Sequence, residues 1–161
     1  MALKSTALLL VVGLGISAAV LAEEEPKAGS LDKSFALPTK GQDVIPVKVK
    51  VGSVMIDQII LDNLPNDQEV RVAQANSSND NSRPKIAVVI SNPTPYKMKA
   101  KLVTSFEGAD GTVYMSCDRK VGIKGLEEDD RFNMCLLDSM KTRDWAQVKK
   151  VHLVASISQD R

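Results

Sequence analysis

Short stretches of alternating apolar and polar residues run along the chain from Val44 onward, and glycine, proline, asparagine or aspartate ends each of them. A period of two residues places one face of a β-strand in a core and the other face in solvent. Asp144 is expected to cap a single helical turn that ends at Val148, with Trp145 as its buried anchor. The alternating stretches predict strands at 47–51, 54–61, 69–74, 85–91, 96–107, 112–121, 132–137 and 150–158.

The longest alternation, at 96–107, separates its residues clearly into two faces. Gly108–Gly111 then predicts a tight hairpin into the next strand. Seven or eight strands of this kind, with no crossover helices between them, predict an all-β domain built as an antiparallel β-sandwich. The predicted inner face of the long strand is apolar except for one threonine and consists of Met98, Ala100, Leu102, Thr104 and Phe106.

Residues 1–43 differ from the rest of the chain. Residues 1–22 combine a single charge with an apolar run at Ala7–Ala22, which is the layout of a secretory signal peptide. A retained membrane anchor is the alternative, but the run is shorter than the ~20 residues that span a bilayer. Residues 23–43 mix proline, glycine, serine and charges, so they predict a flexible leader before a sandwich domain at 44–161. We therefore expect an exported protein, periplasmic or secreted.

The two cysteines, Cys117 and Cys135, both follow the signal segment. An even number of cysteines in an exported chain favours a disulfide over free thiols. A redox-active pair would use the short C-x-x-C spacing, which is absent here. We predict a structural disulfide between these two residues.

Charge excludes two classes of partner. The whole chain has 21 basic and 20 acidic residues, and Lys4 is the one charge within residues 1–22. After signal cleavage the balance is therefore neutral. Nucleic acids and anionic membranes both attract an excess of positive charge, so neither is an expected partner.

Candidate chemistry is sparse. His152, the single histidine, lies on the predicted outer face of the last strand beside two lysines that would disfavour its protonation, and no nucleophile can be placed next to it. Phosphate-loop, serine-hydrolase and zinc-protease motifs are absent, so we expect neither an enzyme nor a cofactor. The alternative is Cu(I) binding by soft sulfur ligands. Those ligands would be Met115, Cys117, Met134 and Cys135.

Two clusters of surface charge are the candidate partner-binding residues. Lys97, Lys99 and Lys101 lie on the outer face of the long strand, about 6.7 Å apart because alternate residues are two rises apart. This ladder could dock an acidic partner, or it could discourage aggregation of the sheet. An acidic cluster closes the loop predicted at 122–131 and could pair with the lysines of another copy. Its members are Glu127, Glu128, Asp129 and Asp130.

The second half of the domain also resembles a known family. The strand 86–92 ends in an asparagine, the alternating strand 96–106 ends in an aromatic residue, and the Asp-Gly hairpin 108–113 is followed by Leu126 and Phe132. This order resembles the immunoglobulin-like FxLYD-type domains of exported bacterial proteins, over residues 85–135. The resemblance implies an immunoglobulin-like sandwich without catalytic residues. We therefore expect a non-enzymatic interaction or structural module of the bacterial cell envelope. It would bind a protein partner or act as an accessory subunit of a larger assembly.

Overall fold

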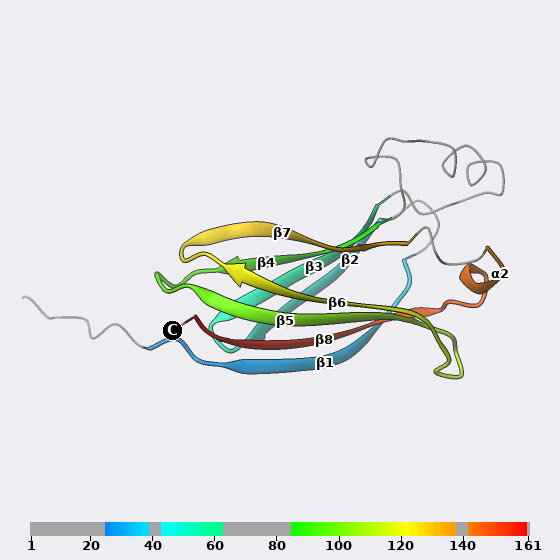
Figure 1. The fold of residues 1–161 in the computed structure, drawn as a ribbon, viewed down its shortest axis with the longest axis horizontal. Helices are drawn as coiled ribbons and strands as arrows, with labels where there is room; N and C mark the ends of the chain where they lie inside the picture. Colours follow the sequence, from blue (N-terminus) through cyan, green and yellow to red (C-terminus); the bar gives the residue numbers. More distant parts are fainter. Residues whose placement is uncertain (1–24, 39–42, 63–84, 138–141, 161) are drawn as a thin grey trace, which may run out of the picture.

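The computed structural model describes residues 25–38, 43–62, 85–137 and 142–160 as two four-stranded antiparallel sheets packed face to face (Figure 1). The all-β sandwich predicted from the alternation is confirmed. The elements in chain order are β1 (Gly29–Ala36), β2 (Val44–Val51), β3 (Val54–Asp62), β4 (Lys85–Asn92), β5 (Met98–Glu107), β6 (Val113–Ile123), β7 (Glu127–Leu136), α2 (Thr142–Trp145) and β8 (Lys150–Gln159).

The first sheet has the strand order β1-β8-β5-β6 and the second has the order β2-β3-β4-β7. Hairpins join β5 to β6 and β2 to β3, whereas the chain changes sheet between β4 and β5 and between β6 and β7. Among the described residues, no helix is long and apolar enough to cross a membrane.

The inner faces of the two sheets form one core. All five residues predicted for the inner face of β5 are buried, which confirms the register read from the alternation. At one end of the core, Trp145 of α2 packs edge-on against Phe106 with 5.4 Å between ring centroids. Trp145 therefore anchors the short helix as expected, although the helix itself spans Thr142–Trp145 and begins earlier than predicted.

A disulfide joins Cys117 of β6 to Cys135 of β7, as predicted, with 6.1 Å between their Cα atoms. The two strands lie at the edges of different sheets, so the bond closes one side of the sandwich. A disulfide indicates an oxidising, extracytoplasmic environment.

Two predictions about irregular segments are wrong. Gly29–Ala36 was expected in the leader, but it forms β1 and pairs along its whole length with β8. It is a strand because Leu31 and Phe35 alternate with polar residues and pack against the core. The acidic cluster was expected in a loop, but Glu127 begins β7 and pairs with Asn92. The predicted signal peptide and the strand at 69–74 lie outside the described residues.

Candidate functional site

A basic groove lies on the outer face of the first sheet, across β8, β5 and β6. Its volume is about 380 Å³. Lys101 of β5 lies directly opposite Lys120 of β6, and Lys99 lies opposite Gly122. We call this surface the lysine groove. Its lining residues are Lys99, Ala100, Lys101, Lys120, Val121, Gly122, Ser156, Ser158 and Asp160.

The charges of the lysine groove are only partly balanced. Lys99 forms an ion pair with Asp160, with 2.5 Å between Nζ and Oδ1. Neither Lys101 nor Lys120 has a carboxylate partner within the described ranges. Like charges directly opposite each other destabilise a sheet. The two ammonium groups therefore lower the stability of the isolated chain and favour an anion between them.

Gly122 leaves the groove open on its β6 side. A Cβ atom built on this residue would meet no atom within 4 Å, so the space above the backbone is empty. On the opposite side of β5, the hydroxyls of Ser156 and Ser158 are exposed. Hydroxyl and ammonium donors beside the open space above Gly122 suit a carboxylate or another oxyanion.

The predicted lysine ladder is thus only partly present. Lys99 and Lys101 line the groove, whereas Lys97 precedes β5 and does not line it. The sequence-based prediction missed Lys120, although the short hairpin at 108–112 fixes the pairing of β5 with β6 and would have placed Lys120 beside Lys101.

The acidic cluster lies apart from the lysines, at the start of β7 in the second sheet. Glu127 pairs with Lys124 at 3.5 Å, and Asp130 lies opposite Ile90. Glu128 and Asp129 are exposed and line a hollow of about 500 Å³. Met55, Ser91, Asn92, Pro93 and Leu126 complete the lining of this hollow.

Leu126 projects from the turn that precedes the acidic residues. Its side chain is 70% exposed, the largest fraction among the exposed large hydrophobic residues of the described chain. Its backbone lies in the left-handed region, with φ of 58°, and its N–H donates to the carbonyl oxygen of Thr94 at 2.8 Å.

A buried asparagine holds this turn in place. The Asn92 side-chain amide donates to the carbonyl oxygens of Tyr96, at 2.8 Å, and Lys124, at 2.9 Å. Its Oδ1 accepts from both the N–H and the hydroxyl of Thr94. Because Asn92 is fully buried and bonded on both sides, the β4–β5 loop and the β6–β7 turn form one rigid unit.

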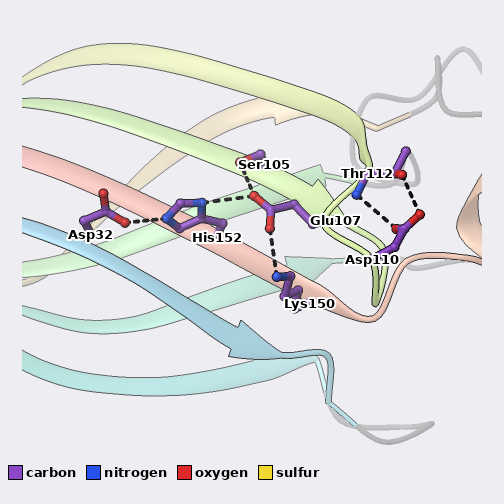
Figure 2. Close-up of polar contacts among 7 residues, drawn as sticks. All are labelled: Asp32, Ser105, Glu107, Asp110, Thr112, Lys150 and His152. Atoms are coloured by element: carbon purple, nitrogen blue, oxygen red, sulfur yellow. Dashed lines mark hydrogen bonds and ion pairs between the residues drawn. The ribbon is translucent and has the colours of Figure 1, made fainter.

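The single histidine is part of a charged network on the outer face of the first sheet (Figure 2). His152 Nε2 lies 2.6 Å from Oδ1 of Asp32, and Nδ1 lies 3.0 Å from Oε1 of Glu107. Glu107 also pairs with Lys150 at 3.2 Å and accepts from Ser105 at 3.3 Å. The network connects β1, β8 and β5.

This network reverses the expectation that His152 would resist protonation. The hydrogen bond with Asp32 raises the pKa of His152, and the bond with Glu107 adds to this against the opposing effect of burial. Burial raises the pKa of Glu107, but hydrogen bonds from Lys150 and His152 outweigh it and hold that pKa below its ordinary value. The partners lie on neighbouring strands, far from His152 in sequence, so the two lysines beside it were misleading.

A second polar contact shapes the nearby hairpin. Asp110 accepts hydrogen bonds from the N–H and the hydroxyl of Thr112, and these lower the pKa of its carboxyl (Figure 2). Gly111, with φ of 86°, occupies a position that favours glycine.

Sulfur ligation of a metal has little support in the oxidised chain. The disulfide uses both cysteines, so Cu(I) would have only Met115 and Met134 unless the bond were reduced. Across the described ranges, histidine, cysteine and acidic side chains form no group of three that could hold a metal ion.

Comparison with known proteins does not assign the chain. No protein-family model matches it, and no curated protein matches it either.

Proposed function

We propose that the chain is a non-enzymatic interaction module of the bacterial cell envelope, periplasmic or secreted, which docks an acidic segment of a protein partner in the lysine groove. A module that binds a protein partner in this way would act as an accessory subunit of a larger assembly. The observation that carries the proposal is Lys101 directly opposite Lys120, with no carboxylate among the described residues to neutralise either. Sites that break a local rule of stability are often functional.

Four features support this role. The disulfide fits an extracytoplasmic compartment, and the N-terminal sequence has the pattern of a signal peptide. The resemblance to FxLYD-type domains implies a module without catalysis. Both ring nitrogens of His152, the single histidine, face carboxylates, so neither is free to accept a proton from a nucleophile.

Charge reversal tests the docking surface. Lys101→Glu with Lys120→Glu should lower recovery of partner proteins from envelope extracts by about tenfold or more, because like charges across an interface cost several kcal/mol and about 1.4 kcal/mol is already a factor of ten. The control is Lys33→Glu with Lys50→Glu, which changes the net charge equally on β1 and β2, outside the groove. Equal recovery with both variants would rule out the groove as the docking surface.

A further inference from the structure

The lysine groove and the turn beyond β6 have complementary surfaces. The groove presents the ammonium groups of Lys101 and Lys120, which pair with no carboxylate of the described residues, beside the open space above Gly122. We call Leu126, Glu128 and Asp129 the acidic tip. It presents two exposed carboxylates beside one strongly exposed leucine.

The groove is large enough to take a side chain. The groove encloses about 380 Å³, many times the roughly 30 Å³ that one water occupies in the liquid. Gly122 contributes no side chain to it, and the stems of the lysines are apolar walls below their charged ends. An apolar side chain flanked by carboxylates is the kind of group that such a groove would accept.

A carboxylate already lies at the edge of the groove. Asp160 neutralises Lys99 there, which shows that the outer face of the first sheet can hold an acidic side chain. Lys101 and Lys120 form no ion pair within the described ranges, so both can receive a carboxylate from a partner.

The acidic tip cannot move to fill the groove of its own chain. Asn92 fixes the turn through the carbonyl oxygen of Lys124, and the N–H of Leu126 is bonded to Thr94. The tip is therefore held against the β4–β5 loop, beside the hollow on the second sheet. A rigid, exposed group of this kind loses little conformational entropy on binding.

Groove and tip belong to the same end of the sandwich. Figure 1 shows the β6–β7 turn, the start of β5 and the end of β8 together at that end. A two-fold axis placed there would repeat any contact between one tip and the groove of the other copy, because a two-fold interface makes every contact twice.

We propose that a second copy of this chain occupies the lysine groove, with Leu126 over Gly122 and with Glu128 and Asp129 paired to Lys101 and Lys120. The result is a two-fold dimer that contains two identical tip-in-groove contacts. This inference rests on the proposed function and names the partner of the same groove.

Reciprocal charge reversal tests the dimer by sedimentation equilibrium of the purified chain, as the cell processes it. One variant carries Lys101→Glu and Lys120→Glu, and the other carries Glu128→Lys and Asp129→Lys. Each variant alone should dimerise about tenfold or more weakly than the wild type, because like charges then face each other. An equimolar mixture should recover wild-type affinity, since opposite charges meet at both contacts. Every sample has the same N-terminal segment, so that segment cannot cause the difference.

A misfolded variant cannot produce this result, because two misfolded chains would not recover affinity on mixing. The dimer would be overturned if the wild type were still a monomer at about millimolar concentration, where even weak association is seen. It would also be overturned if the mixture of the two variants dimerised no more tightly than either variant alone. If the dimer fails but the groove variant still loses envelope partners relative to Lys33→Glu with Lys50→Glu, the proposed function stands with a different partner. If neither effect is seen, both proposals fail.

Discussion

Thr104 places a hydroxyl group in the apolar core, and its replacement tests how the core is packed. The residue is fully buried on the inner face of β5, between Cys117 of β6 and Leu153 of β8. Its Oγ1 has no hydrogen-bond partner among the described residues. A buried hydroxyl without a partner costs about 1–3 kcal/mol of desolvation. Thr104→Val keeps the branched shape and removes that cost.

We expect Thr104→Val to raise the free energy of unfolding by about 1–2 kcal/mol. This is less than the full desolvation cost, because the methyl group of valine is larger than the hydroxyl and fits the core less well. The matched control is Thr104→Ser, which keeps the hydroxyl and removes the methyl group. It should lower stability by about 1 kcal/mol, close to the value of one buried methylene.

Urea unfolding monitored by Trp145 fluorescence gives both values. The midpoint should shift while the m-value stays constant, because neither change alters the surface exposed on unfolding. The melting temperature should move by about 4 °C for each kcal/mol, where the range for domains of 60–100 residues meets the range for 150–250 residues. A valine variant less stable than the wild type would show that the hydroxyl is bonded, and the reasoning would fail.

Three further predictions concern the network, the turn and the disulfide. The pKa of His152 is raised in the folded state. Its stabilising effect is therefore complete below the pKa of the unfolded state and is lost as pH rises through the pKa of the folded state. Urea unfolding from pH 5 to 9 should show this loss of stability in the wild type and not in His152→Gln. The lowered pKa of Glu107 acts oppositely, and its contribution should be lost only as pH falls through that folded value. Leu126→Gly should leave monomer stability within about 1 kcal/mol, because glycine adopts positive φ freely, but should abolish dimerisation; dimerisation that persists would contradict the role of Leu126. Reduction of the disulfide, which joins residues 18 apart, should lower the free energy of unfolding by roughly 3 kcal/mol in the chain-entropy model, and an unchanged urea midpoint would contradict this.

The sequence predicted the features that depend on local pattern. Alternation in β5 identified its buried face, and the hairpin at 108–112 was found from its glycines and aspartate. β1 was missed because a stretch with only two large apolar residues, Leu31 and Phe35, resembles a leader until its partner strand is known. Strand pairing to β8 converts that weak pattern into structure.

The candidate site depended on contacts between strands, which local patterns do not show. Lys99 and Lys101 were visible as a ladder, but the groove also needs Lys120, Gly122 and the serines of β8. The 108–112 hairpin sets the register of β6 against β5, so the position of Lys120 could be predicted from the sequence. The pairing of β5 with β8 joins segments far apart in the chain, and no local pattern predicts it. The same limitation concealed Asp32 and Glu107 as partners of His152.

The pairing of β1 with β8 also has a consequence for the order of folding. β1 is the first described strand of the chain and β8 is the last, and β8 is the one strand with which β1 pairs. During synthesis β1 is therefore made early, and its backbone stays unpaired until β8 has also been made. The first sheet can be completed only after β8 has been made, so we expect the nascent chain to stay incompletely folded until then.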